Sequence, residues 1–486
     1  MRRNNDMPSL KEDLTAVCGP ERVSDKLVDR ICYTRDCGPS PGGIPGYVVR
    51  PVSTEEVAGI VRAANRHQTP IFVWGRSTTF IGNGIREGCI LMAMDLMRAI
   101  ERIDLERKLV VVQPGAVWHA VDVELNKLGW ELGVPGPGGM FSCSIGGSVA
   151  YNAVPHGLAE YGMTGEHVAG LEVVLPNGEI LHTGSGANEP AGHPHFERYA
   201  NGPDLTGLFI GSCGVFGIIT KVYFRIRRIP EAEEFAFYGF DSVDRAVDAA
   251  QSIQQQEAAT HLVGLFGGPK PAGYEQYDAF LHIVVRDSRL RAGERRRIAE
   301  AVCEAHGGHP LDSNATRRYW TEHMYSWLRN TPPDYYYGNR PYTCPEVAGF
   351  IPTQAVKDAI AYLRQDAVEH AEEFQRYDIR IKCYDVYFSR NGAFIWIDTL
   401  YPELDERSWR YGLALRERYT DELMRRYMSP GGILQALAPV VMPKLGAGFE
   451  LMKALKRTLD PNYILNPGVL LMEPEDTPQV TPEVAW

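Results

Sequence analysis

The sequence predicts a two-domain α+β protein, and its length and a change of pattern along the chain support this. Its 486 residues exceed the length of an ordinary single domain. Residues 40–230 alternate short apolar strands with helices and are rich in small residues. After Pro230 the pattern changes to amphipathic helices beside apolar strands, which is typical of a sheet with helices on one face. We therefore expect a second domain to begin near residue 231.

The first domain shows clear strand and helix signals. Residues 46–74 predict a strand, a helix and a strand; Ser53 stands where an N-cap is expected, with Glu56 as its capping-box partner. Asn177-Gly178 separates two alternating runs and predicts a hairpin. We also expect strands in 89–96, 109–115 and 215–230, and a helix in 118–129.

The second domain is expected to contain helices in 241–256 and 352–374 and strands in 277–286, 379–389 and 392–402. In the strand 379–389, period-2 alternation places Tyr384 and Tyr387 on opposite faces of the sheet. A site on one face of the sheet can therefore include only one of these two side chains. The last helix ends at Asp460-Pro461, and an extended tail follows.

Composition excludes several classes of function. A net charge of −11 and a pI near 5.7 argue against a nucleic-acid-binding protein. The two N-terminal arginines precede no apolar segment, so we expect no signal peptide, and no apolar run is long enough for a membrane span. The nine cysteines are scattered, and only Cys32 and Cys37 are close together. This pattern predicts reduced thiols, a cytoplasmic location and no metal site.

Four glycine-rich loops indicate a ligand that approaches the backbone. Glycine lets a ligand contact main-chain N–H groups directly, and such groups favour phosphate oxygens. No loop contains GxxxxGK[ST], and none opens a βαβ unit with GxGxxG, so a P-loop and a nicotinamide site are disfavoured. Four such loops in one domain predict an extended phosphate-containing ligand. They are WGRSTTFIGNG (74–84), GVPGPGGMFSCSIGGSVAYN (133–152), HGLAEYGMTG (156–165) and GLFIGSCGVFG (207–217).

These loops, together with the segments around them, resemble the FAD-linked oxidases and dehydrogenases of the vanillyl-alcohol oxidase and p-cresol methylhydroxylase type. This group also includes glycolate and D-lactate dehydrogenases. The resemblance covers nearly the whole chain and is most specific between residues 43 and 228. The matching segments are YVVRPVSTEEV (47–57), GRSTT (75–79), MDL (94–96), VVVQPGAVW (110–118), SIGG (144–147), LEVVLPNGEI (171–180), GSCGVFGIITK (211–221) and LDPNYILNPG (459–468).

The resemblance implies a two-domain PCMH-type FAD-binding fold with an α+β cap. Residues 1–230 would form the FAD-binding domain, 231–440 the cap or substrate domain, and 441–486 a segment that returns to the FAD-binding domain. The FAD pyrophosphate would lie between the 75–79 and 142–147 loops, where side chains at Gly146 and Gly147 would block it. The implied FAD-binding residues are Trp74, Gly75, Arg76, Ser77, Thr78, Thr79, Gly82, Pro135, Gly136, Ser142, Ser144, Ile145, Gly146, Gly147, Asn152, Tyr161, Gly162, Gly211, Gly217, Ile218, Ile219 and Asn466.

The sequence departs from its relatives where they place catalytic and flavin-linking residues. No histidine lies near Thr78 or near Gly392 and Ala393, where some relatives attach flavin, so we expect noncovalent FAD and interpret Cys143 as a coincidental near-match. The metal motif of the lactate-type members falls on Phe388–Ile395 and has lost both histidines. The Tyr-Arg pair of the phenol-oxidising members is also missing from GGILQALAPVVMP (431–443). We therefore expect an apolar or aromatic pocket, walled by residues 334–345 and 383–391, with no metal.

The resemblance implies hydride transfer from a small substrate to the flavin, and we expect an apolar or aromatic alcohol as that substrate. One alternative is a D-2-hydroxy-acid dehydrogenase that passes electrons to a partner protein or quinone; another is a catalytically silent flavin-binding subunit. His156 is the best candidate for the proton acceptor because histidine titrates near neutral pH. Oxygen, a quinone or an electron-transfer protein would reoxidise the flavin, and a second copy of the chain, in a homo-oligomer, is a further candidate partner. The further catalytic candidates are Tyr161, Tyr384, Tyr387 and Arg390.

Overall fold

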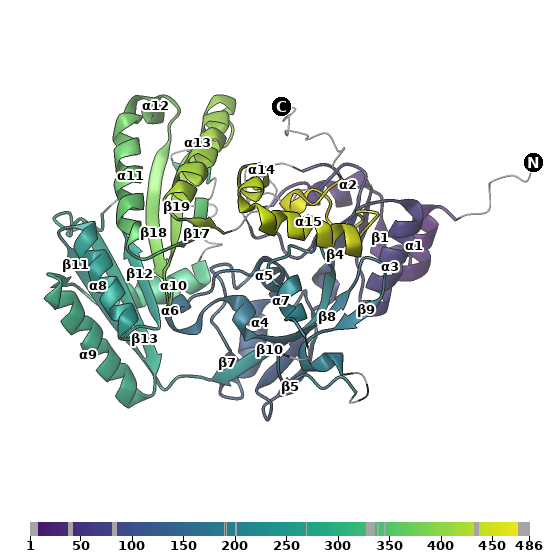
Figure 1. The fold of residues 1–486 in the computed structure, drawn as a ribbon, viewed down its shortest axis with the longest axis horizontal. Coiled ribbons are helices and arrows are strands. Elements are labelled where there is room, and N and C mark those ends of the chain that lie inside the picture. Colours follow the sequence, from purple (N-terminus) through teal and green to yellow (C-terminus); the bar gives the residue numbers. More distant parts are fainter. Residues whose placement is uncertain are drawn as a thin grey trace, which may run out of the picture.

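The computed structural model describes most of the chain and shows two lobes side by side (Figure 1). Within its described part the chain forms sheets of four, six and ten strands. The first two sheets lie in one lobe, and the third forms the other. The described residues are 8–36, 42–79, 85–188, 190, 192–199, 202–268, 270–326, 336–337, 340–344, 347–431 and 437–474.

The four-stranded sheet has the order β1-β2-β4-β3, with β2 and β3 both parallel to β4. Its apolar side chains pack with those of the helices α1 and α3 into one core. Ser53 caps α3 as predicted and accepts a hydrogen bond from the Glu56 amide. The predicted capping box is incomplete, because the Glu56 side chain instead pairs with Arg22 and accepts from the Val52 amide. The bounds are α1 Leu10–Cys18, β1 Val23–Ser24, α2 Leu27–Arg30, β2 Tyr47–Val49, α3 Thr54–His67, β3 Ile71–Trp74 and β4 Ile90–Ala93.

The six-stranded sheet has the order β5-β6-β10-β8-β9. The strand β7 pairs with the C-terminal end of β10. The hairpin predicted at Asn177-Gly178 joins β8 to β9, and Gly178 has the positive φ of 84° that such a turn requires. The bounds are β5 Ile100–Asp104, β6 Leu109–Val112, α4 Trp118–Asn126, β7 Trp130–Leu132, α5 Ile145–Tyr151, α6 Leu158–Tyr161, β8 Val168–Val174, β9 Ile180–His182, α7 Leu205–Phe209 and β10 Ile218–Arg228.

The ten-stranded sheet forms the cap lobe, on the left of Figure 1. Side chains from its helices α8, α9, α11 and α13 pack with one face of the sheet into a large core. The other face carries a second apolar cluster that includes Tyr387 and Phe394 and contacts Leu158 of the FAD-binding lobe. The strand bounds are β11 Ala232–Phe240, β12 His261–Leu265, β13 Ala279–Asp287, β14 His309–Pro310, β15 Tyr336–Tyr337, β16 Arg340–Thr343, β17 Val347–Ile351, β18 Arg380–Phe388, β19 Ala393–Pro402 and β20 Ser429–Pro430. The helix bounds are α8 Val243–Gln255, α9 Arg289–Ala305, α10 Asn314–Ser326, α11 Ala355–Glu369, α12 Ala371–Arg376 and α13 Glu406–Arg425.

The C-terminal segment packs against the first lobe, where Phe449 and Val469 join the same core as Trp118. Its helices are α14 Ala438–Val441 and α15 Ala447–Leu459. Buried Lys456 holds this segment in place: its Nζ donates to Asp460 Oδ2 at 2.7 Å and to the carbonyl oxygens of Val215 and Leu465 at 2.8 and 2.6 Å. The loop after α15 is thereby fixed beside β3 and the glycine-rich loop at 211–217.

Candidate flavin and active site

A cavity of about 510 Å³ opens between the two lobes. Three of the four predicted glycine-rich loops contribute several residues to it, and the fourth, 156–165, contributes His156 and Met163. The C-terminal segment adds Asn466, Val469 and Leu470, and the cap adds aromatic side chains. The cavity therefore joins segments that are distant in sequence, as a site for an extended ligand requires.

Two loops of the first lobe come together at Gly75 and Gly147, and the Ser144 hydroxyl lies beside both glycines. A Cβ atom on Gly75 would lie 2.9 Å from Ser144 Oγ and 3.5 Å from the Cα of Gly147. A Cβ atom on Gly147 would also lie 2.9 Å from Ser144 Oγ and would face Gly75. Gly146 is constrained differently, since its Cβ would clash with Pro114 on the protein side. A side chain at 75 or 147 would displace the Ser144 hydroxyl, which caps α5, whereas a side chain at 146 would clash with Pro114.

Side-chain hydrogen bonds fix the ends of these loops. Asn466 has a left-handed backbone, with φ at 42°, and its Oδ1 accepts from the Val73 amide at 3.0 Å. Its Nδ2 donates to the Cys213 carbonyl oxygen at 2.7 Å, so one side chain links the C-terminal segment to β3 and to the 207–217 loop. Asn152, at the end of α5, is also left-handed and accepts from the Gly165 amide at 2.9 Å. The cavity is therefore held rigidly from several directions.

His156 lines the cavity and is buried. Its Nδ1 lies 2.8 Å from the carbonyl oxygen of Gly136, which can only accept, so Nδ1 carries the proton and Nε2 carries the lone pair of the neutral ring. Burial lowers the pKa of His156 to about 4, while the hydrogen bond to Gly136 opposes this shift. The ring is consequently neutral near pH 7 and able to accept a proton.

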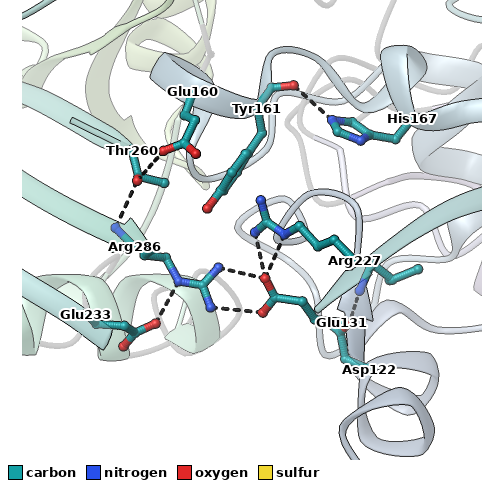
Figure 2. A network of polar contacts seen from close by, with 10 residues as sticks. Asp122, Glu131, Glu160, Tyr161, His167, Arg227, Glu233, Thr260 and Arg286 are labelled. Carbon is teal, nitrogen blue, oxygen red and sulfur yellow. Dashed lines mark hydrogen bonds and ion pairs between the residues drawn. The ribbon is translucent and has the colours of Figure 1, made fainter. Parts of the chain in front are cut away.

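The other catalytic candidates lie in different places. Tyr387 lines the cavity on the cap side, whereas Tyr384, on the opposite face of β18, lies in the core of the cap. Tyr161 is away from the cavity lining, and its ring lies under the guanidinium of Arg227, 3.4 Å from ring centroid to Cζ (Figure 2). Arg390 is exposed and binds Glu166 and the carbonyl oxygen of Glu160. The structure therefore brings together His156 and Tyr387 from this set.

Most of the predicted FAD-binding residues meet in the cavity. Ile145 is buried behind it, and Pro135, Gly136, Ser142, Tyr161 and Gly162 lie outside its lining. Gly82 lies outside the described residues. Those that line the cavity are Trp74, Gly75, Arg76, Ser77, Thr78, Thr79, Ser144, Gly146, Gly147, Asn152, Gly211, Gly217, Ile218, Ile219 and Asn466.

The aromatic wall expected on the cap is built mostly from residues that the sequence analysis does not name. Phe350, Phe394 and Tyr387 are paired across β17, β19 and β18, so their rings form a row on one face of the sheet. Trp396, two residues after Phe394, extends the row, with ring centroids 5.2 Å apart. The alternation in residues 392–402 could have placed Phe394 and Trp396 on one face, but the strand pairing could not be read from the sequence. Of the wall predicted at 334–345, residues 334–335, 338–339 and 345 lie outside the described residues.

Within the described ranges, no three His, Cys, Asp or Glu side chains are arranged to hold a metal ion. None of the helices there has the length and apolar character needed to span a bilayer. None of the cysteines whose side chains are described in these ranges forms a disulfide bond.

Two family profiles match the lobe that contains the loops. One, described as FAD binding domain, covers residues 45–184, and the other, FAD linked oxidases, C-terminal domain, covers residues 442–470. The chain thus carries both domains that characterise the FAD-linked oxidases. This FAD-linked oxidoreductase is 26% identical to the glycolate oxidase subunit GlcD of Bacillus subtilis, over 94% of this chain and 96% of the relative. It is 24% identical to the D-2-hydroxyglutarate dehydrogenase of Stutzerimonas stutzeri, over 95% and 98%.

The fold of this FAD-linked oxidoreductase is that of p-cresol methylhydroxylase. The two structures superimpose with a TM-score of 0.79 at 17% identity, covering 96% of each chain. The predicted family, the two-domain PCMH-type fold and FAD as the cofactor are thus confirmed. The domain boundaries at 230 and 440 remain predictions.

The residues of the cavity fit this cofactor. The close approach of Gly75 and Gly147 leaves main-chain atoms rather than side chains at the surface of the slot. Arg76 adds a positive charge to the lining beside the first loop. These are the features that a pyrophosphate needs.

Proposed function

We propose that this FAD-linked oxidoreductase oxidises the CH–OH carbon of a 2-hydroxy acid. The observation that carries the proposal is that relatives named for glycolate and D-2-hydroxyglutarate match the chain over nearly its whole length. When bound, FAD supplies the acceptor for the hydride that leaves this carbon. The protein must then remove the proton of the hydroxyl group and orient the carbon toward the flavin.

His156 is suited to remove that proton. It lies at the cavity surface, and its bond to Gly136 fixes the ring in the tautomer with the lone pair on Nε2. Its low pKa keeps the ring neutral at physiological pH, although it also makes His156 a weaker base than an ordinary histidine. Tyr387 faces the same cavity and can orient the substrate through its hydroxyl group.

The aromatic wall favours a second candidate, an apolar or aromatic alcohol without a carboxylate. Phe350, Phe394 and Trp396 present ring faces and edges rather than charges to the cavity. Such a wall suits an apolar group, because burying a carboxylate without a partner is costly. The two candidates differ in whether the substrate needs a carboxylate.

We propose that FAD is bound noncovalently. Cys143 lines the cavity, but burial raises the pKa of its thiol to about 12, so it is protonated and a poor nucleophile. Acid precipitation should therefore release all of the flavin into the supernatant. Flavin fluorescence that stays with the denatured chain on a gel would contradict noncovalent binding.

We further propose that the reduced flavin passes its electrons to a partner protein or a quinone. The support is that the Bacillus subtilis relative is named as a subunit of glycolate oxidase. Oxygen consumption and dye reduction, compared on the same preparation, test this: rapid turnover with dye and little with oxygen is the expected result.

The experiment that tests the function is anaerobic bleaching of the bound flavin by a panel of alcohols. The panel contains glycolate, both enantiomers of lactate, 2-hydroxyglutarate and mandelate, and phenolic and aliphatic alcohols without a carboxylate. We expect the fastest bleaching from a 2-hydroxy acid. Bleaching only by alcohols without a carboxylate would support the second candidate. No bleaching by any of them, with a flavin that dithionite reduces, would support a noncatalytic subunit instead.

A further inference from the structure

The segment 154–162 carries His156 to the cavity and lies between the two lobes. Its helix, α6, spans only Leu158–Tyr161, and one turn of helix is not stable by itself. The position of His156 therefore depends on the hydrogen bonds that this segment makes to its neighbours.

The FAD-binding lobe holds both ends of the segment. At one end the backbone amide and Nδ1 of His156 both donate to the Gly136 carbonyl oxygen. At the other end Nε2 of His167 lies 2.8 Å from the Tyr161 carbonyl oxygen, and Arg227 covers the Tyr161 ring (Figure 2). Between these ends, the segment faces the cap.

The cap holds the middle of the segment through the start of β12. The amide of Gly157, the residue after His156, donates to Nδ1 of His261 at 3.1 Å. One residue before His261, Thr260 donates its hydroxyl to Glu160 Oε2 at 2.5 Å, and its carbonyl oxygen accepts from the Glu160 amide at 3.3 Å. Two adjacent cap residues thus bind both sides of α6.

His261 is buried and is close to the reacting region. Its ring centroid lies 5.6 Å from that of His156 and 5.5 Å from that of Tyr387, which lines the cavity. Because Nδ1 accepts from Gly157, the neutral ring carries its proton on Nε2. The side chain thus supplies an acceptor to the backbone next to His156 from the opposite domain.

An ionic joint, a group of ion pairs around Arg286, links the neighbouring cap strand β13 to the FAD-binding lobe (Figure 2). Arg286 of β13 donates to both carboxylate oxygens of Glu131 in β7, at 3.1 and 2.9 Å, and to Glu233 at 2.7 Å. Arg227 also pairs with Glu131 at 2.7 Å. The amide of Arg286 donates to Thr260 Oγ1 at 2.9 Å, so the joint is continuous with the contact to Glu160.

We propose that His261 is a positioning residue: through its hydrogen bond to Gly157, the cap sets the position of the His156 ring in the cavity. The inference rests on the proposed function, in which His156 accepts the substrate proton. Small displacements of a catalytic group cost orders of magnitude in rate. A hydrogen bond that crosses the domain boundary directly beside His156 makes the docking of the cap part of the active-site geometry.

The test compares His261→Asn with His261→Leu in the holoenzyme. The Asn amide oxygen can take the place of Nδ1 as acceptor, whereas Leu fills similar volume without one. With the alcohol that bleaches the flavin fastest, we expect the reduction rate at saturating substrate to fall at least tenfold in His261→Leu and less than threefold in His261→Asn. FAD content should be unchanged in both. Equal rates in the two variants would overturn the proposal.

Hydrogen exchange provides a readout that does not depend on turnover. The peptide containing residues 156–162 should exchange faster in His261→Leu than in the wild-type protein and in His261→Asn. Unchanged exchange in His261→Leu would also overturn the proposal. Should His261→Leu not fold, His261→Phe replaces it, since a phenyl ring fills the site of the imidazole without an acceptor for the Gly157 amide. Faster exchange and slower reduction are expected again, and wild-type values of both would overturn the proposal.

His156→Asn, assayed in parallel, separates failure of this inference from failure of the proposed function. If His156→Asn reduces its flavin as fast as the wild-type protein, the acceptor role is wrong, and the exchange measurement still decides whether His261 holds the segment. If His156→Asn is slow but His261→Leu is normal in both readouts, the positioning role alone fails.

Discussion

The flavin cleft and the cap wall face each other across one cavity but are built by different means. The cleft consists of main chain, brought close by glycines such as Gly75 and Gly147. The wall consists of side chains, such as Phe350 and Trp396, from strands that meet only in the folded sheet. A site built from main-chain atoms needs particular residues at a fixed spacing in the sequence. A wall built from side chains needs only residues of suitable size and polarity. The cleft can therefore be recognised in a sequence, and the substrate wall cannot.

The largest effect is expected where the two loops of the cleft meet. Gly147→Trp would fill the gap toward Gly75, so the purified protein should lack FAD and its absorption near 450 nm, the band expected of any oxidised flavin. The matched control is Gly448→Trp, because a side chain at this exposed helical glycine meets no neighbouring atom. A normal flavin spectrum in Gly147→Trp would show that the cleft is not the binding site.

The second effect separates chemistry from binding. His156→Asn keeps a donor for the Gly136 carbonyl oxygen but removes the base, so we expect flavin reduction to slow by about 10²- to 10⁴-fold with FAD retained. His370→Asn is the control, since this cap histidine also contacts a carbonyl oxygen, that of Asp366, but lies outside the cavity lining. Stopped-flow spectroscopy without oxygen measures the rates. Similar rates for both variants would remove His156 from the reaction.

A third effect concerns the side chain that supports the cleft from behind. Lys456→Met leaves the buried Asp460 without its cation, so the free energy of unfolding should fall by about 3 kcal/mol. Lys453→Met, in the same helix, removes a pair with the exposed Glu450 and a contact with the Phe449 ring, and should change the free energy of unfolding by less than about 1 kcal/mol. Denaturant unfolding measures both, and equal losses would mean that the Lys456 pair has no special role.

The smallest effect lies at the joint between the lobes and depends on pH. Burial raises the pKa of Asp122 to about 7, whereas in the unfolded chain this group ionises near pH 4. Between these values the folded protein binds more protons, so Asp122 lowers stability as the pH rises through this range. Asp122→Asn keeps the acceptor for the Leu132 amide and should raise the melting temperature more at pH 8 than at pH 5.5. An equal change at both pH values would contradict the raised pKa.

The sequence predicted the fold and much of the cleft because both depend on local patterns. The hairpin at Gly178 and the end of α15 at Asp460 follow from turn and helix-end signals. The sequence places His156 at the start of a glycine-rich loop, and that loop brings it to the cavity. Trp396 was missed because its exposure to the cavity depends on which strands pair. His261 gave no signal either, since its contact with Gly157 spans 104 residues of sequence.

The most direct measurement is an experimental structure of the protein with its flavin. The pyrophosphate should lie between residues 75–79 and 144–147, within hydrogen-bond distance of their main-chain N–H groups, with the isoalloxazine ring between His156 and the wall of Tyr387 and Trp396. A flavin bound elsewhere, or these two loops closed against each other with no phosphate between them, would contradict this assignment of the site.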